Sequence, residues 1–316
     1  MNRAVGYIVI LFLLFVVACG GGKKNPTTRT SGTIHISVDE SFMPLLDTEI
    51  AVFEDLHPEA HIIPDYKSER DCFRDLVNDS AALIVVTRPL NEEETGYFED
   101  MQIPIVSKAI ARDAVTLIVN PSNDDTLMTM ADIREIMMGK EGTPDYDVVF
   151  DEQNSSLVRF MIDSVNEGKP LASGTKAAGG SKEVVDYVAS HKNALGVIGV
   201  SWVSNPYDST GLSFLKKINV VSIMGDSTYD YLSKSATFDP KDPDFNKYFF
   251  KPYQAYIAFK SYPLTRNVYF ILRQPYYGLG TGFANFLGGN KGQMIIGKNR
   301  LYPLNLNIQI RRASLN

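Results

Sequence analysis

The feature that most constrains this fold is an alternation of short apolar segments with segments of helical spacing. Residues 81–86 (AALIVV) form a continuous apolar run, which is typical of a strand buried on both faces of a sheet. Residues 33–38 (TIHISV) alternate between polar and apolar side chains, as a half-buried strand does. Between these runs, Cys72, Phe73 and Leu76 mark one face of a helix. Because strands and helices alternate in this way, the sequence predicts an α/β fold.

The alternation continues through the second half of the chain. We expect two separate strands at residues 103–106 and 114–119, an irregular segment at 226–251 and a strand-like segment at 255–259. The further expected elements are helices at residues 130–138, 155–165, 183–189 and 283–287, and strands at residues 148–150, 196–200, 218–223 and 268–272. Beyond the N-terminal segment roughly 285 residues remain, which is enough for two domains. Two α/β lobes on one chain predict a hinged receptor with its ligand in the cleft.

Residues 1–18 have the pattern of a secretory signal peptide. Arg3 supplies a positive start, residues 5–17 are almost wholly apolar, and a small residue precedes Cys19. Cys19 resembles the lipidated cysteine of a bacterial lipobox; the alternative is an uncleaved anchor with an incidental cysteine. Residues 19–31 are rich in Gly, Lys, Pro and Thr, which predicts a flexible tether. We therefore expect a cell-envelope protein that is lipid-anchored to a bacterial membrane and faces the periplasm or the exterior.

Composition and residue spacing exclude several classes of function. The formal net charge is −6, and a chain without a basic excess is not expected to bind nucleic acid. Apart from Cys19 the sequence holds only Cys72, and its four histidines are scattered, so neither a disulfide framework nor a metal site is predicted. We place Cys72 in the core. Because no nucleophile–base motif is present, we expect no catalytic residue and no cofactor. We also expect a monomeric protein.

Polar residues at four predicted junctions indicate an anion-binding site. An oxyanion requires many aimed N–H donors, and helix N-termini supply them with a favourable dipole, to which hydroxyl groups add rotatable donors. Asn154, Ser155 and Ser156 could instead be plain helix caps, each contributing about 1 kcal/mol, and Phe42 could be a hydrophobic staple. Taken together, the junctions favour one oxyanion site in the cleft. Its predicted members are Ser41, Phe42, Ser68, Thr87, Asn154, Ser155 and Ser156.

Several motifs, in their order along the chain, resemble those of the phosphate-binding lipoproteins of bacterial ABC importers. The resemblance covers nearly the whole chain after the leader. It implies the type II periplasmic binding protein fold: two lobes, each a mixed sheet flanked by helices, joined by two hinge strands. It also implies inorganic phosphate as the ligand and the permease subunits of an ABC importer as partners. The motifs are ESFMPLL (40–46), YKSERDCFRDL (66–76), ALIVVTRPLNEEE (82–94), NSS (154–156), NALGVIGVSWV (193–203), YPLTRNVYFIL (262–272) and GFANFLGGNKGQMIIGKNRLYPLN (282–305).

The resemblance fixes the expected lobes and also shows two departures. Residues 32–112 and 266–316 are expected to form the first lobe, and residues 113–265 the second. Asp151 stands where the resemblance implies an arginine, and Thr87 where many members have an aspartate that accepts the proton of the phosphate. The expected positive charge therefore has to come from another residue.

Three arginines are candidates for that charge. Arg159 lies one helical turn after Ser155, so it either reaches toward the cleft or pairs with an acidic neighbour, Asp151 or Asp163. Arg88 follows Thr87 and is a comparable candidate. Arg70 is a weaker one, because acidic residues flank it.

Three functions are compatible with these observations. The first is a phosphate receptor that delivers its ligand to an ABC importer. The second is a receptor of the same fold for another anion, or one that signals to a membrane sensor, and the replaced residues motivate it. The third, an enzyme on the same scaffold, lacks support because no nucleophile–base pair or metal cluster is present.

Overall fold

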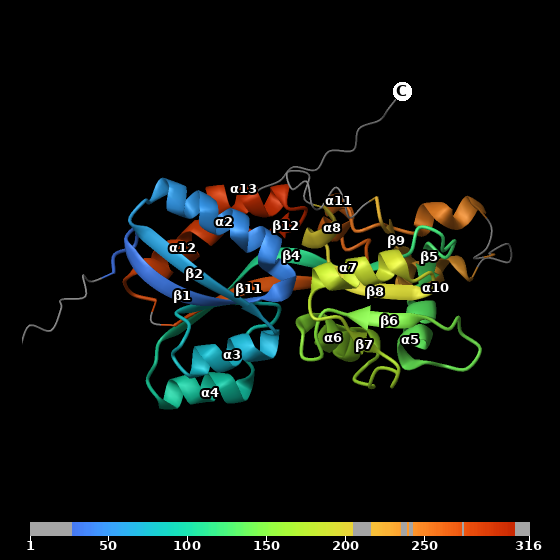
Figure 1. Ribbon diagram of the computed structural model, residues 1–316, viewed down its shortest axis with the longest axis horizontal. Coiled ribbons are helices and arrows are strands. Elements are labelled where there is room, and N and C mark those ends of the chain that lie inside the picture. Colours follow the sequence, from blue (N-terminus) through green and yellow to red (C-terminus); the bar gives the residue numbers. More distant parts are fainter. Residues whose placement is uncertain (1–26, 205–215, 235–238, 240–242, 274, 307–316) are drawn as a thin grey trace, which may run out of the picture.

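A computed structural model describes most of the chain after the leader (Figure 1). The described residues are 27–204, 216–234, 239, 243–273 and 275–306. The predicted signal peptide, the predicted lipidation at Cys19 and most of the predicted tether lie outside them. The last residues of that tether form a turn, in which the Thr28 N–H donates to the Ser31 carbonyl at 3.0 Å. Among the described residues, no helix has the length and apolar character needed to cross a membrane.

The first lobe is built on a mixed sheet. Its strand order is β2-β1-β3-β11-β4, with β12 added at β4. β1 is parallel to β2 and β3, whereas β11 is antiparallel to β3 and β4. The strands are β1 (Gly32–Asp39), β2 (Ala60–Lys67), β3 (Leu83–Val86), β4 (Ile105–Val119), β11 (Thr265–Arg273) and β12 (Tyr302–Pro303).

Helices cover both faces of this sheet: α2, α12 and α13 lie on one side, and α3 and α4 on the other (Figure 1). In α2 the apolar residues Leu46, Ile50 and Phe53 recur at helical spacing and are buried. α4 begins with a capping box between Asn91 and Glu94. The helices are the 3₁₀ helix η1 (Glu40–Phe42), α2 (Met43–Leu56), α3 (Glu69–Val77), α4 (Glu92–Asp100), α12 (Leu279–Gly288) and α13 (Asn290–Lys298).

The second lobe continues from β4 in the order β4-β8-β6-β7, with β9 also on β4 and a separate pair formed by β5 and β10. α7 lies on one side of the main strands, and α5 and α6 lie on the other (Figure 1). The strands are β5 (Leu127–Thr129), β6 (Asp147–Phe150), β7 (Lys176–Ala177), β8 (Ala194–Gly199), β9 (Asn219–Val220) and β10 (Ser222–Met224). The helices are α5 (Met130–Met138), α6 (Ser156–Phe160), the π-helix η2 (Met161–Val165), α7 (Ser181–Ser190), α8 (Ser201–Ser204), α10 (Asp226–Leu232), the 3₁₀ helix η3 (Pro243–Tyr248) and α11 (Gln254–Ala258).

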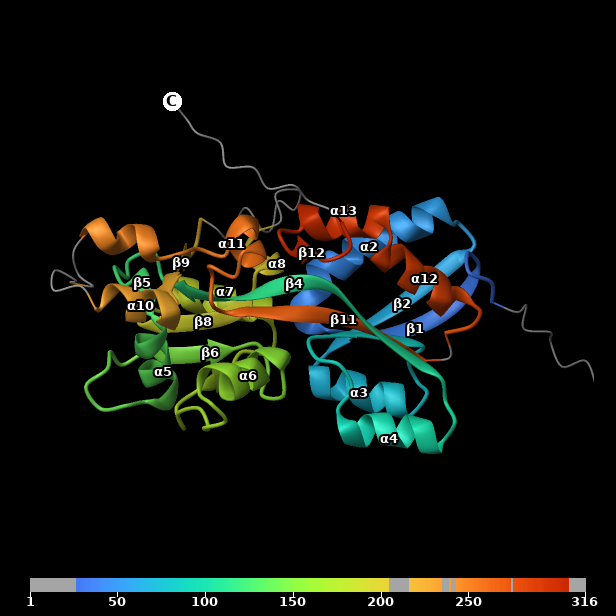
Figure 2. The same cartoon turned by 180° about the vertical axis from the view of Figure 1, so that it is seen from behind.

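The long strand β4 connects the two lobes (Figure 2). It pairs with β11 as far as Ala114, which lies opposite Thr265, and with β8 from Val115 onward. The predicted α/β fold with two lobes, each a mixed sheet flanked by helices, is confirmed. We propose that the lobes divide where β4 and β11 cross, along the bounds expected from the sequence, and that these two strands form the hinge.

Three predictions for local structure were wrong. The structure has one 15-residue strand, β4, in place of the two strands expected at residues 103–106 and 114–119; it begins at Ile105, and its polar middle part hid its continuity. The segment predicted to be strand-like at residues 255–259 is the helix α11, and its last carbonyl groups, of Ile257 and Ala258, accept hydrogen bonds from Arg112. The segment expected to be irregular, at residues 226–251, contains α10 and η3.

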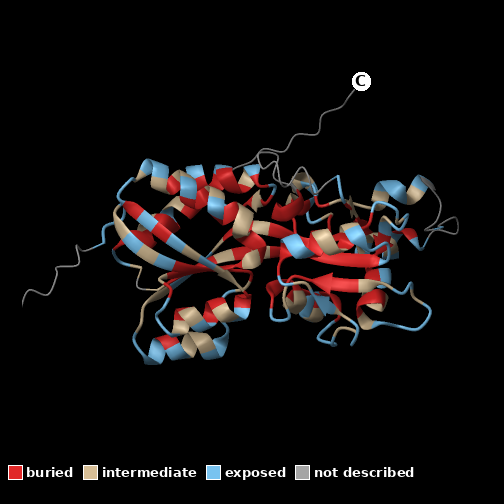
Figure 3. Ribbon diagram, viewed as in Figure 1, coloured by how far each residue is buried: buried red, intermediate tan, exposed pale blue. Residues whose placement is uncertain are grey.

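Buried residues are found throughout both lobes (Figure 3), and most of the apolar ones form one core. All residues of β3 and β8 are buried, as expected for strands covered on both faces. A smaller cluster lies between α3, α4 and the sheet, and it includes Cys72, which is buried as predicted. The core therefore holds the strands of both lobes in place. The predicted site residues Ser41 and Thr87 follow the ends of two of these strands, β1 and β3.

Candidate anion-binding site

The first wall of the candidate site lies at the carboxyl end of β1. Asp39 caps η1: its Oδ1 accepts a hydrogen bond from the Ser41 N–H at 3.0 Å and another from the Ser41 hydroxyl. Ser41 and Phe42 are completely buried. Because the Asp39 carboxyl is fully enclosed, burial raises its pKa, although the charge of Arg266 opposes this shift.

The second wall lies at the start of α6, on the other lobe. Ser155 caps this helix by accepting a hydrogen bond from the Val158 N–H at 3.3 Å, so its predicted position at a loop-to-helix junction is confirmed. Ser156 is fully buried and Asn154 is exposed. Asp151, the residue that stands in place of an expected arginine, is buried, and burial raises the pKa of its carboxyl to about 7, with a further contribution from the charge of Asp39.

Arg266 supplies the positive charge between these two walls. Its guanidinium donates three hydrogen bonds: Nε to Asp113 Oδ2 at 2.8 Å, Nη1 to Ser156 Oγ at 2.7 Å and Nη2 to Ser41 Oγ at 3.0 Å. It also lies over the ring of Phe42, with the guanidinium carbon 5.4 Å from the ring centroid. A guanidinium has five N–H donors, and three of those of Arg266 are used in these hydrogen bonds. Arg266 therefore joins serines from opposite lobes.

Arg266 was not among the predicted site residues, because the strand was expected only at residues 268–272. β11 begins three residues earlier, at Thr265, and Arg266, Val268 and Phe270 then lie on one buried face. Side chains two residues apart share a face of a strand. The signal in the sequence was an arginine two residues before Val268, on the same face of the strand as the apolar residues. A guanidinium buried on that face requires an acidic or hydroxyl partner, which indicates a polar site.

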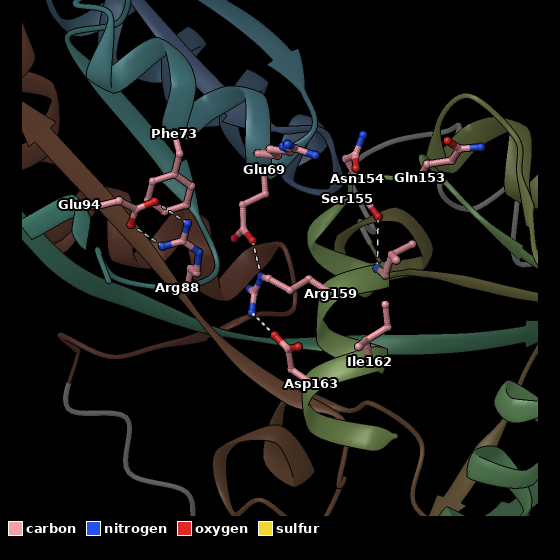
Figure 4. A pocket seen from close by; sticks show the side chains of 12 residues that line it. Glu69, Phe73, Arg88, Glu94, Gln153, Asn154, Ser155, Arg159, Ile162 and Asp163 are labelled. Carbon is pink, nitrogen blue, oxygen red and sulfur yellow. Dashed lines mark hydrogen bonds and ion pairs between the residues drawn. The ribbon is translucent and has the colours of Figure 1, made fainter. Parts of the chain in front are cut away.

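A second group of predicted residues gathers around Glu69, which Figure 4 shows together with Arg159. Ser68 caps α3, as expected for its junction, and accepts a hydrogen bond from the Asp71 N–H at 3.3 Å. The next residue, Glu69, uses Oε1 to accept two hydrogen bonds from Thr87, one from the N–H and one from the hydroxyl, both at 2.7 Å. Thr87 lies directly after β3, at its carboxyl end. Glu69 was not among the residues predicted to form the site.

Arg159 reaches this group from the other lobe. Its Nε donates to Glu69 Oε2 at 2.6 Å, and its Nη2 donates to Thr87 Oγ1 at 2.7 Å. Of the two acidic partners considered for Arg159, Asp163 lies 3.5 Å away, and no bond to Asp151 is formed. Burial by itself would raise the pKa of Glu69, but the charge and hydrogen bonds of Arg159 and the hydrogen bonds of Thr87 outweigh it and lower this pKa. Glu69 is therefore a buried carboxylate.

The other two candidate arginines are used differently. Arg88 binds both carboxylate oxygens of Glu94 at 2.7 Å and stacks on Phe73, with its guanidinium carbon 3.6 Å from the ring centroid. Its charge is thus neutralised within the first lobe. Arg70 is exposed at the rim of the cleft.

A cavity of about 430 Å³ opens between α3 and α6, next to the Glu69–Arg159 pair (Figure 4). Both lobes contribute to it. Its lining residues are Glu69, Arg70, Phe73, Arg88, Glu94, Gln153, Asn154, Ser155, Val158, Arg159, Ile162 and Asp163.

Two further contacts join the lobes beside the site. The Glu40 carboxylate accepts hydrogen bonds from the Ser181 N–H at 3.1 Å and from the Ser181 hydroxyl at 2.7 Å, at the N-terminus of α7. The Ser201 hydroxyl donates to the Ser41 carbonyl at 2.9 Å. The structure therefore shows the two lobes closed on each other.

The interior of the site is rich in carboxyl groups. Asp39, Asp113 and Asp151 are buried, and each has one carboxyl oxygen without a hydrogen-bond partner among the described residues. Among the residues that the structure describes, no group of three or more histidine, cysteine, aspartate or glutamate side chains could hold a metal ion. The arrangement is suited to a ligand that accepts hydrogen bonds from serine and arginine and also donates them to carboxyl oxygens.

Comparisons with known proteins identify the family of this architecture. A family model described as a PBP superfamily domain matches residues 23–291. No curated protein matches the sequence.

Three solved structures are similar over 86% of this chain. One is a substrate-binding protein from Clostridium perfringens, assigned to phosphate ABC transporters and solved with bound phosphate (TM-score 0.66, 18% identity, 100% of its own chain covered). Another is an ABC-type phosphate transport receptor from Vibrio cholerae (TM-score 0.59, 16% identity, 100% covered). The third is described as a possible phosphate binding protein from Planctomyces limnophilus (TM-score 0.55, 20% identity, 93% covered). At these identities the likeness concerns the fold, and the predicted two-lobe type II fold is confirmed.

Proposed function

Because the chain belongs to the PBP superfamily, the superfamily of periplasmic binding proteins, we propose that it captures an oxyanion, inorganic phosphate above all, between its two lobes. The proposal includes delivery of the ligand to the permease subunits of an ABC importer. It also includes a monomeric protein, held at the outer face of a bacterial membrane by a lipid on Cys19, that binds its ligand without turnover.

The observation that carries this proposal is the position of Arg266. Its guanidinium lies between Ser41 and Ser156, which come from opposite lobes, and the side chain is only 3% exposed. In a desolvated site, charge-assisted hydrogen bonds to an oxyanion are about twice as strong as neutral ones. Closure of the lobes would then bring the anion, the guanidinium and the two hydroxyl groups together.

The two departures from the expected site also support a protonated anion. Arg266 and Arg159 supply the cationic charge that position 151 lacks. The carboxyl group of Asp39, one oxygen of which has no hydrogen-bond partner among the described residues, supplies the proton acceptor that Thr87 does not provide. A fully deprotonated anion such as sulfate leaves this buried oxygen unpaired, which costs about 1–3 kcal/mol. Phosphate, which carries at least one proton at neutral pH, can donate a hydrogen bond to it.

The alternative is a receptor of the same fold for another anion, or one that reports to a membrane sensor. The excess of buried carboxyl groups around Arg266 favours this alternative over a receptor for highly charged anions. A ligand with one negative charge and several hydroxyl groups would meet the same requirements. Such a ligand would use the same cleft and the same arginine.

Isothermal titration of the purified protein with phosphate and with sulfate tests the proposal. We expect saturable phosphate binding, no sulfate binding, and an affinity at least tenfold lower for Ser156→Ala, since that change removes one hydrogen bond to a charged group, worth about 1.5–3 kcal/mol. Ser190→Ala, an exposed serine at the end of α7, is the matched control and should bind phosphate as the native protein does. If phosphate produces no heat of binding and does not stabilise the protein against thermal unfolding, phosphate is excluded as the ligand. A screen of monovalent organic anions would follow.

A further inference from the structure

The donors at one side of the cleft are already occupied by a carboxylate of the protein itself. Glu69 takes the N–H and the hydroxyl of Thr87 on one oxygen and the guanidinium of Arg159 on the other. A backbone N–H, a hydroxyl and an arginine are the same kinds of donor that a bound oxyanion requires. The carboxylate of Glu69 therefore stands in this structure where an oxygen of an anionic ligand could stand.

The Glu69–Arg159 pair also spans the boundary between the lobes. Glu69 is at the first position of α3 in the first lobe, and Arg159 belongs to α6 in the second. Nε and Oε2 are 2.6 Å apart, and the exposed fraction of the glutamate side chain is 4%. By contrast, Arg88 and Glu94, which lie on the same cavity, pair within one lobe. Of these two ion pairs, only Glu69–Arg159 therefore depends on contact between the lobes.

We propose that Glu69 is a tethered competitor for the anion: it holds the lobes closed when no ligand is bound and lowers the affinity for the ligand that displaces it. This rests on the proposed function, because it assumes that the ligand uses the donors of Thr87 and Arg159. A ligand shifts a conformational equilibrium only by its difference in affinity for the two states. Since Glu69 already stabilises the closed state, an anion gains only the difference between its own interactions and those of Glu69.

Single-molecule fluorescence resonance energy transfer between a dye on each lobe measures the ratio of open to closed molecules in the absence of ligand. Both labelling positions, Glu99→Cys in α4 and Lys140→Cys after α5, are exposed. The background is Cys19→Ser, and Cys72 is buried and so shielded from the dye. Without anion, we expect Glu69→Gln and Arg159→Gln each to raise the ratio of open to closed molecules at least fivefold, the lower end of typical coupling between sites. Asp226→Asn, which removes an Arg–carboxylate pair within the second lobe, is the control and should leave the ratio unchanged.

Phosphate titration of Glu69→Gln provides the second measurement. We expect phosphate to bind this variant at least fivefold more tightly than the native protein. An unchanged open-to-closed ratio in both variants that remain folded by circular dichroism overturns the proposal. So does unchanged or weaker phosphate binding by Glu69→Gln, which would make Glu69 a contact of the ligand or a bystander. If phosphate binds neither protein, the proposed phosphate function fails, and the lobe distances alone still decide whether Glu69 holds the lobes closed.

Discussion

Arg266 and Asp113 form an ion pair that is almost completely shielded from solvent. Nε of the arginine lies 2.8 Å from Oδ2 of the aspartate, and the exposed fractions of the two side chains are 3% and 0%. The two residues are cross-strand partners on β11 and β4, the strands that connect the lobes. Burial raises the pKa of the Asp113 carboxyl, and the charge of Arg266 opposes this shift. The pair therefore places the cationic centre of the candidate site on the two strands of the proposed hinge.

Removal of one partner of this pair should destabilise the protein strongly. Arg266→Gln leaves a buried carboxylate without its counter-charge, and we expect the free energy of unfolding to fall by about 3–5 kcal/mol in urea titrations. The double variant Arg266→Met with Asp113→Leu should lose less, because no buried charge remains unpaired. Lys182→Gln, which breaks an exposed pair with Asp186, is the control and should cost about 1 kcal/mol or less. A double variant that is as unstable as the sum of both single changes would contradict this account.

Glu49 should make stability depend on pH. Its side chain is fully buried in α2, neither carboxyl oxygen has a hydrogen-bond partner among the described residues, and burial raises its pKa from 4.5 to about 9. Between these two pKa values the folded state binds more protons than the unfolded state, so the free energy of unfolding falls as pH rises through that window. Glu49→Gln removes this dependence, and the variant should lose less stability than the native protein between pH 5 and pH 8, by on the order of 1–4 kcal/mol.

The measurement for Glu49 is urea unfolding at a series of pH values. Asp55→Asn, on the exposed side of the same helix, is the control and should follow the native pH curve. If Glu49→Gln and the native protein show the same slope, the carboxyl is not held in its neutral form.

Asp151 should control the pH dependence of anion binding. Burial raises the pKa of its carboxyl to about 7, so it is neutral at pH 6 and mostly ionised at pH 8. The ionised form repels an anion in the cleft. We expect Asp151→Asn to bind phosphate about tenfold more tightly than the native protein at pH 8, equivalent to about 1.4 kcal/mol, and with similar affinity at pH 6. Titrations at both values decide this, and an equal effect at pH 6 and pH 8 would sink the idea.

Two helical glycines should respond in opposite ways to alanine. A Cβ at Gly282 in α12 would lie 1.8 Å from the carbonyl oxygen of Arg29, so Gly282→Ala must displace the N-terminal turn and destabilise the protein, by about 1–3 kcal/mol. Gly96 in α4 has no atom within 4 Å of the same position. Gly96→Ala should therefore stabilise the protein by about 0.5–1 kcal/mol, the usual gain in a helix. Thermal unfolding of both variants measures the difference, and stabilisation by Gly282→Ala would show that the turn is not held against α12.

The proposed lipid anchor makes a separate prediction for Cys19. In cells supplied with radioactive palmitate, the native protein should become labelled and should be recovered in the membrane fraction. The Cys19→Ser variant should remain unlabelled. Cys72→Ser is the matched control, since Cys72 is buried and should carry no lipid. Label on the Cys19→Ser protein would place the anchor elsewhere.

Much of the fold was predictable because it rests on local patterns. The predicted strands β1 and β3 are present, and Ser68 and Ser155 cap their helices. Each of these features depends only on residues that are close in the sequence. α11 was assigned wrongly because a five-residue apolar segment fits either a strand or a short helix. The helix is supported by Arg112, which donates hydrogen bonds to its last carbonyl groups. Arg112 lies 145 residues from Ile257 in the sequence, so no local pattern indicates this contact.

The sequence alone determined that Ser41, Ser68, Thr87 and Ser155 lie at the ends of strands or the starts of helices, because capping and hydrophobic periodicity are short-range effects. Only the tertiary structure decided which charges meet these residues. Arg266 reaches Ser156 across 110 residues, and Arg159 reaches Glu69 across 90 residues. A buried charge takes whichever partner the packing of the two lobes brings within about 3 Å. Such a pairing has no local signature, so the cationic centre and the carboxylate that occupies its neighbouring donors appeared only when the lobes were seen together.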